Sequence, residues 1–182
     1  SQQRRSSAAS DGYKRQLQDS INRILSIAAV HEVLSQRGLR LVEITDVLQR
    51  VGRAVAQNMG RPGLQVDVTV EGDQVSLPSQ AATSLALVVN ELLQNALEHA
   101  FVGRSRGRVA ISVRRLPGEL QIEVRDDGVG VSGSLGRQLG LEIVETLVRE
   151  DLGGDWSMAA EAGTVARIAV PLAHESGAGP QP

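Results

Sequence analysis

The 182-residue sequence contains no cysteine and almost no aromatic side chains. Without cysteine the chain has no disulfide, no thiol nucleophile and no cysteine-ligated zinc site, as is common in a reducing compartment. Tyr13, Phe101 and Trp156 are its only aromatic residues. The hydrophobic core must therefore consist mainly of Leu, Val, Ile and Ala.

A basic charge excess and a long hydrophobic run are also missing. The formal net charge is −2, whereas nucleic-acid-binding proteins carry a basic surface and often stack bases on aromatic side chains. No apolar run approaches the roughly 20 residues that span a bilayer, and no signal peptide opens the sequence. We expect no nucleic-acid binding, no membrane contact by this chain, and a cytoplasmic location.

The order of the expected elements predicts an α+β fold. Helices are expected over residues 11–37, 43–59, 79–100, with Ser79 as its N-cap, and 140–150. Strands are expected over residues 64–70, 75–77, 108–116, 119–125, 155–161 and 164–172. This order predicts a two-layer sandwich of a mixed β-sheet with helices on one face, preceded by a long helix of a helical bundle.

Two polar residues lie at the edge of the apolar stripe of the helix that begins near Ser79. Asn95 comes seven residues after Val88, and Glu91 lies one turn before Asn95, so the two side chains are neighbours. An amide and a carboxylate in this position can hold a hydrated Mg²⁺, which prefers oxygen ligands and keeps several waters. An ordinary polar helix face gives the same pattern.

Asp126 extends the inward-facing side of a predicted strand, after Leu120, Ile122 and Val124. A carboxylate that faces the core is costly unless it is paired. The sequence D-D-G-V-G starts at Asp126, and its glycines permit a sharp turn and a close approach by a ligand. An inward aspartate above such a turn can accept a hydrogen bond from the exocyclic amine of adenine. A simple Asp-Asp-Gly turn is the alternative.

Two weaker features follow toward the C-terminus. Thr164 has the same strand parity as Ala166 and Ile168, so its hydroxyl should point inward, although threonine is common in strands. A glycine-rich stretch at residues 133–140 precedes a predicted helix, and backbone amides at a helix N-terminus favour phosphate. Neither feature is specific on its own.

In combination, these segments resemble the ATP-binding fold shared by gyrase-type ATPases, Hsp90 and histidine kinases. The resemblance covers about residues 43–172 and is carried by N-E-L-L-Q-N-A-L-E-H, D-D-G-V-G, the glycine-rich loop and E-A-G-T. It implies ATP bound with Mg²⁺, with the metal on Asn95 and the adenine on Asp126. Glu91 becomes the catalytic residue, either as a base or by orienting a metal-bound water. The nucleotide-binding residues that it implies are Asn95, His99, Asp126, Gly128, Gly130, Gly136, Gly140, Leu141 and Thr164.

The leading segment, from Leu17, looks like the second dimerisation helix of a histidine-kinase subgroup with a short lid. This resemblance implies a sensor histidine kinase that phosphorylates a histidine on a preceding helix, passes the phosphoryl group to a response regulator, and is a homodimer at full length. His31 is expected to be a structural seam residue. The alternative function is an anti-sigma-factor-type serine kinase or switch protein of the same ATP fold, which would lack this helix.

The expected domains follow from these two resemblances. Residues 1–38 are assigned to a partial dimerisation region without its acceptor helix, residues 39–173 to the ATP-binding catalytic domain, and residues 174–182 to a disordered tail.

Overall fold

The computed structural model describes residues 41–58, 63–130 and 139–172. The expected long helix at 11–37, His31, Gly136 and the tail at 174–182 lie outside these residues. The elements are, in chain order, β1 (Leu41–Glu43), α2 (Ile44–Asn58), β2 (Gln65–Gly72), β3 (Ser76–Pro78), α3 (Ser79–Asn95), the π-helix η1 (Ala96–Ala100), β4 (Arg106–Leu116), β5 (Glu119–Asp126), α4 (Leu139–Thr146), the π-helix η2 (Leu147–Asp151), β6 (Asp155–Ala160) and β7 (Thr164–Pro171).

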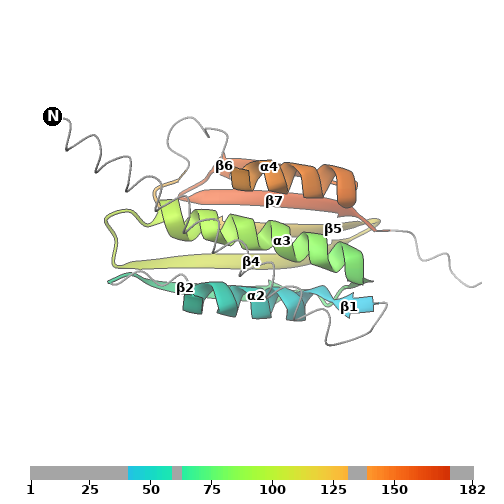
Figure 1. Ribbon diagram of the computed structural model, residues 1–182, viewed down its shortest axis with the longest axis horizontal. Helices are drawn as coiled ribbons and strands as arrows, with labels where there is room; N and C mark the ends of the chain where they lie inside the picture. Colours follow the sequence, from blue (N-terminus) through green and yellow to red (C-terminus); the bar gives the residue numbers. More distant parts are fainter. Residues whose placement is uncertain (1–40, 59–62, 131–138, 173–182) are drawn as a thin grey trace, which may run out of the picture.

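A five-stranded mixed sheet forms one layer of the domain. Its strand order is β2-β4-β5-β7-β6, and β1 pairs with β3 in a separate two-stranded ladder. The β2–β4 pair is parallel, whereas the other three pairs of the large sheet are antiparallel. Figure 1 shows α2, α3 and α4 side by side over one face of this sheet, with α3 in contact with both neighbours. The predicted α+β sandwich is therefore confirmed.

The alternation of side chains along the strands determines which face carries the helices. In β5, Leu120, Ile122, Val124 and Asp126 are buried, while the residues between them are only partly buried. The helix α3 crosses above this face and is itself buried along most of its length, with Leu85, Val88 and Val89 fully enclosed. Strand β5 is thus the middle strand of the five-stranded sheet, and α3 lies between α2 and α4 in the helical layer (Figure 1).

The core contains almost no aromatic side chain, as the composition indicates. Its largest fully buried side chains are those of Ile, Leu and Val. Phe101 is the exception at 4% exposure, and its ring lies so close to Gly107 that a Cβ there would collide with it. In the described part of the chain, no helix is both long and apolar enough to cross a membrane.

The expectation that Ser79 caps α3 is wrong. Ser79 is already the first helical residue, and Pro78 precedes it as an N-cap without a side-chain hydrogen bond. Pro78 is also the last residue of β3 and pairs with Leu41 of β1. The chain therefore passes directly from strand to helix, and Ser79 instead offers its carbonyl oxygen to the hydroxyl of Thr83 at 2.8 Å.

Candidate functional site

A buried carboxylate lies at the end of β5. Asp126 is 6% exposed, and its Oδ1 accepts hydrogen bonds from the backbone N–H groups of Gly128 (2.9 Å) and Thr164 (3.1 Å). These two donors compensate the burial of the charge. No hydrogen bond to the second oxygen, Oδ2, forms within the residues that the structure describes. The strand parity of β5 thus predicts the burial of Asp126 correctly, and one oxygen of its carboxylate is held in a defined position.

The turn between β6 and β7 packs directly on Asp126. Gly163 has a φ of +124°, and a Cβ at this position would collide with the carbonyl oxygen of Asp126. Gly130, with a φ of +78°, lies beside the same turn, where its Cβ would be 3.2 Å from the carbonyl oxygen of Gly163. Both positions therefore require glycine, because a side chain would be strained in this backbone conformation and would push the turn away from the carboxylate.

The end of the α3–η1 helix forms the opposite side of the site. The backbone N–H of Val129 donates to the carbonyl oxygen of Ala100 at 2.9 Å. Gly128 lies against Ala100 so closely that a Cβ would collide with both the methyl group and the carbonyl oxygen of that residue. This contact joins the loop that follows Asp126 to the helix that carries Glu91 and Asn95.

Glu91 and Asn95 are neighbours on α3, as predicted, and both are withdrawn from solvent. Glu91 is 6% exposed, while Asn95 is half-buried at the last position of the helix. The Nδ2 atom of Asn95 is buried and has no hydrogen-bond partner within the described residues. An orphaned buried amide costs about 1–3 kcal/mol. A ligand that engages this amide would remove the penalty.

The described residues contain no group of three or more His, Cys, Asp or Glu side chains that could hold a metal ion. A cation at Asn95 would therefore depend on oxygens from the amide, from water and from a ligand. Mg²⁺ is commonly bound in this way, because it keeps several waters and uses substrate phosphates as ligands.

The remaining predicted site residues fall into different settings. Thr164 is half-buried and contributes its backbone N–H to Asp126, while Gly140 is buried in the first turn of α4 and Leu141 packs against the core. His99 lies on the exposed side of η1, with its Nε2 3.7 Å from a carboxylate oxygen of Glu98. The structure brings Asp126, Gly128, Gly130 and Thr164 together. The roles assigned to His99, Gly140 and Leu141 stay predictions.

Sequence reasoning missed Ala100 and Asp127, which both hold the loop after Asp126. The signal for Asp127 was present in the Asp-Asp doublet, because only one of two consecutive strand residues can face the core. Nothing in the local sequence marks Ala100, whose contribution is a backbone carbonyl.

Comparisons with known proteins identify relatives of this chain. A family model described as histidine kinase-, DNA gyrase B-, and HSP90-like ATPase matches residues 80–174, and a model described as histidine kinase matches residues 1–59. Sensor histidine kinase PdtaS of Mycobacterium tuberculosis is 35% identical over 161 residues, which cover 85% of this chain and 32% of that protein. Blue-light-activated histidine kinase 2 of Erythrobacter litoralis is 32% identical over 142 residues, covering 75% of this chain and 40% of that protein.

A solved structure has a similar fold. The histidine kinase domain of a blue-light-activated histidine kinase from Erythrobacter litoralis superposes with a TM-score of 0.73 at 28% identity, covering 84% of this chain and 74% of that one. The chain spans about a third of the length of the PdtaS proteins that it matches.

The ATPase model covers about half of the chain, including the helix, loop and strand that form the site. The chain therefore belongs to the family of histidine kinase-, DNA gyrase B- and HSP90-like ATPases. Within that family it is the ATP-binding catalytic domain of a sensor histidine kinase. The anti-sigma-factor-type kinase, expected as the alternative, is not favoured by these relatives.

Proposed function

We propose that the full protein is a histidine protein kinase in which this domain, located in the cytoplasm, transfers the γ-phosphoryl group of ATP to a histidine on an upstream helix. A response regulator then receives the phosphoryl group, and the kinase acts as a homodimer through its helical region. The observation that carries this proposal is the buried carboxylate of Asp126, which accepts hydrogen bonds from two backbone N–H groups. Gly163 packs directly against the backbone of the same residue. The sensor histidine kinases among its relatives support the same conclusion.

The adenine base is proposed to bind at Asp126. Its Oδ1 is committed to Gly128 and Thr164, which leaves Oδ2 to accept a hydrogen bond from the exocyclic amine. A hydrogen bond to a charged group contributes about 1.5–3 kcal/mol. Gly130 and Gly163 let the turn between β6 and β7 pack against the backbone of Asp126, because a Cβ at either position would meet a backbone carbonyl oxygen. The backbone amides at the start of α4, near Gly140 and Leu141, favour the phosphates, since the N-terminus of a helix attracts anions.

The reacting end of the nucleotide is proposed to lie near Asn95 and Glu91. Oδ1 of Asn95 is the proposed ligand of Mg²⁺, which would neutralise charge on the phosphate oxygens during transfer. The unpartnered Nδ2 of the same amide is a hydrogen-bond donor and suits an acceptor oxygen of the nucleotide. The histidine nitrogen forms a bond to the γ-phosphorus while the bond to the β–γ bridging oxygen breaks, and ADP leaves. Glu91 is buried one turn away. It can accept the proton that the imidazole loses, or hold a metal-bound water in place.

Phosphoryl transfer with γ-labelled ATP tests this proposal. The full-length protein should acquire acid-labile label on a histidine upstream of this domain, whereas the 182-residue chain alone should bind ATP without becoming labelled. Acid-labile label on the chain alone that disappears in His31→Gln would place the acceptor at His31 and contradict the upstream assignment. Absence of any acid-labile label on the active full-length protein would refute the kinase proposal itself.

A further inference from the structure

We propose that Asp127 is a positioning residue for the nucleotide site. Its side chain replaces a backbone acceptor at the end of β5 and thereby fixes where the chain leaves the sheet to form the adenine-binding loop. This inference rests on the proposed role of Asp126 in binding adenine. Asp127 itself does not face the nucleotide, because it has the opposite strand parity from Asp126 and is exposed.

The hydrogen bonds around Asp127 show how the strand pairing ends. Asp126 is the last residue of β5 and pairs with Val109 of β4. One residue further, the N–H of Asp127 still donates to the carbonyl oxygen of Arg108 at 3.2 Å, as an antiparallel ladder requires. A regular ladder would also contain the reciprocal bond, from the N–H of Arg108 to the carbonyl oxygen of Asp127, but here the acceptor is another atom of Asp127. The N–H of Arg108 donates to the Asp127 side chain, at Oδ1 (2.8 Å).

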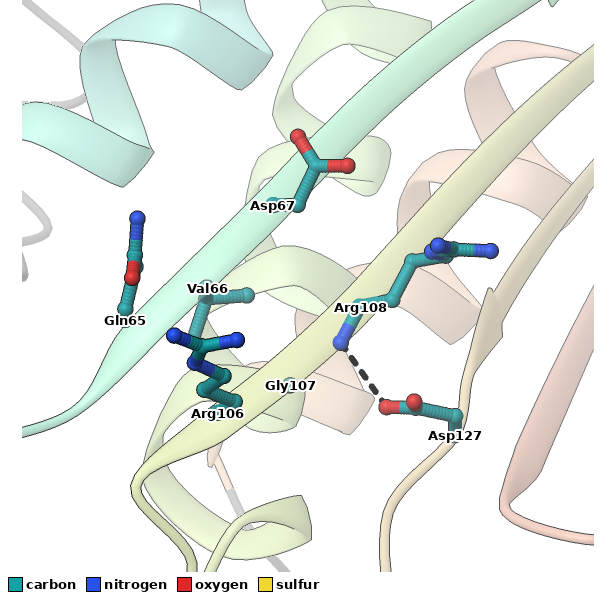
Figure 2. Close-up of a pocket in the computed structure, with 7 residues that line it drawn as sticks. All are labelled: Gln65, Val66, Asp67, Arg106, Gly107, Arg108 and Asp127. Atoms are coloured by element: carbon teal, nitrogen blue, oxygen red, sulfur yellow. Dashed lines mark hydrogen bonds between the residues drawn. The ribbon is translucent and has the colours of Figure 1, made fainter.

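The carbonyl group of Asp127 is thereby released from the ladder. Its oxygen instead accepts a hydrogen bond from Nη1 of Arg104 at 2.5 Å. Figure 2 shows the Asp127 carboxylate directed at the backbone of Arg108, at one end of a groove of about 520 Å³. The chain turns away from β4 at this carbonyl and continues to Gly128, whose N–H donates to Asp126.

Loss of the side-chain acceptor would change the balance between two positions of the loop. With no Oδ1 at residue 127, the N–H of Arg108 can be satisfied by the carbonyl oxygen of the same residue, which extends the ladder and draws the loop toward β4. The same movement pulls Gly128 away from Asp126 and Val129 away from Ala100. We therefore expect the carboxylate of Asp126 to lose its defined position while the five strands stay paired.

The chain offers a matched control at the other end of β4. Asp73 donates its backbone N–H to the carbonyl oxygen of Val113 at 2.9 Å, and its Oδ2 accepts from the N–H of Arg115 at 2.8 Å. As at Asp127, a backbone N–H donates to a carbonyl oxygen of β4 and the carboxylate accepts from a backbone N–H of β4, although Asp127 makes both contacts with Arg108 alone. Arg108 and Arg115 are seven residues apart, roughly 23 Å along an extended strand, so loss of the Asp73 carboxylate should destabilise the strand end without reaching the nucleotide.

Calorimetric binding of ATP and inosine triphosphate to the 182-residue chain tests the positioning role. Asp127→Ala should weaken ATP binding about tenfold, the effect of roughly one lost hydrogen bond at the site, and should reduce the preference for ATP over inosine triphosphate. Asp127→Asn keeps an acceptor oxygen and should stay within about twofold of the unmodified chain. Asp73→Ala should lower the unfolding midpoint about as much as Asp127→Ala and leave ATP affinity unchanged.

Three results would overturn the inference: unchanged ATP affinity in Asp127→Ala, an equal loss in Asp127→Asn, or an equal loss in Asp73→Ala. The second would point to the charge of Asp127 rather than to its acceptor geometry, and the third to a general loss of stability. Asp126→Asn, measured alongside, separates the two proposals. If Asp126→Asn abolishes the preference for ATP and Asp127→Ala does not alter it, the positioning role fails alone. If Asp126→Asn also keeps the preference, the adenine assignment fails.

Discussion

Substitution of Gly128 by alanine is a direct test of the contact between the loop that follows Asp126, which we propose binds adenine, and the helix that carries Asn95. The new methyl group would collide with both the side chain and the carbonyl oxygen of Ala100. Two hydrogen bonds flank the collision, from Gly128 N–H to Asp126 and from Val129 N–H to Ala100. The loop must therefore move away from the helix, and both bonds must lengthen.

The size of the effect follows from this geometry. Overpacking a closely packed contact costs about 1–3 kcal/mol. If the loop moves to relieve the overlap, the cost falls mainly on nucleotide binding, because the bound state needs the original loop position. A change of 1–3 kcal/mol corresponds to a roughly 5- to 150-fold increase in Kd for ATP. The unfolding midpoint should also fall, because both bonds lengthen, although strand pairing is unaltered.

Gly153→Ala is the matched control for this experiment. Gly153 has a φ of +61°, and no atom lies within 4 Å of the Cβ that a substitution would add. Alanine in this left-handed conformation costs about 1–2 kcal/mol, so stability should fall while ATP affinity stays the same. Wild-type ATP affinity in Gly128→Ala, or an equal loss of affinity in Gly153→Ala, would refute the reasoning.

Three further substitutions have defined outcomes. Asn95→Ala should abolish the Mg²⁺ dependence of ADP affinity measured by calorimetry; a retained dependence would place the metal elsewhere. Ser84→Ala removes the 3.0 Å hydrogen bond from a buried hydroxyl to Asp151 and should lower the free energy of unfolding by about 1–2 kcal/mol. An unchanged denaturation curve would contradict this prediction. The hydrogen bond from Arg167 is the main cause that lowers the pKa of Glu161 below its ordinary 4.5. The stability it provides is present above pH 4.5 and is lost as the pH falls through the lowered value. In Glu161→Gln the melting temperature should therefore decrease less steeply as the pH is lowered below 4.5. The same decrease in the variant and the unmodified chain would contradict the assignment.

Periodicity alone predicted the parts of the fold that depend on side-chain direction. The alternation of Leu120, Ile122 and Val124 indicated that Asp126 faces the core, and the structure confirms it. The apolar stripe of α3 was likewise predicted, because the direction of the side chains repeats within a few residues in both helices and strands. These signals are local, so a single sequence contains them.

The contacts that complete the site are not local, and the sequence did not reveal them. The parallel pairing of β2 with β4 joins segments about 40 residues apart, and the three-residue strand β1 is too short to show a period. The contact between Gly128 and Ala100 depends on a backbone carbonyl, which every residue carries. Capping by Ser79 was predicted from residue type, but strand pairing at Pro78 places the helix start one residue earlier than a cap at Ser79 requires.

The central claim is that the buried carboxylate of Asp126 recognises the exocyclic amine of adenine. The most direct measurement compares calorimetric Kd values for ATP and inosine triphosphate, which lacks this amine, in the unmodified chain and in Asp126→Asn. The unmodified chain should bind ATP roughly 10- to 150-fold more tightly, the equivalent of one hydrogen bond to a charged group. In Asp126→Asn this preference should largely disappear while the fold is retained. An equal preference for ATP in both proteins would contradict the account.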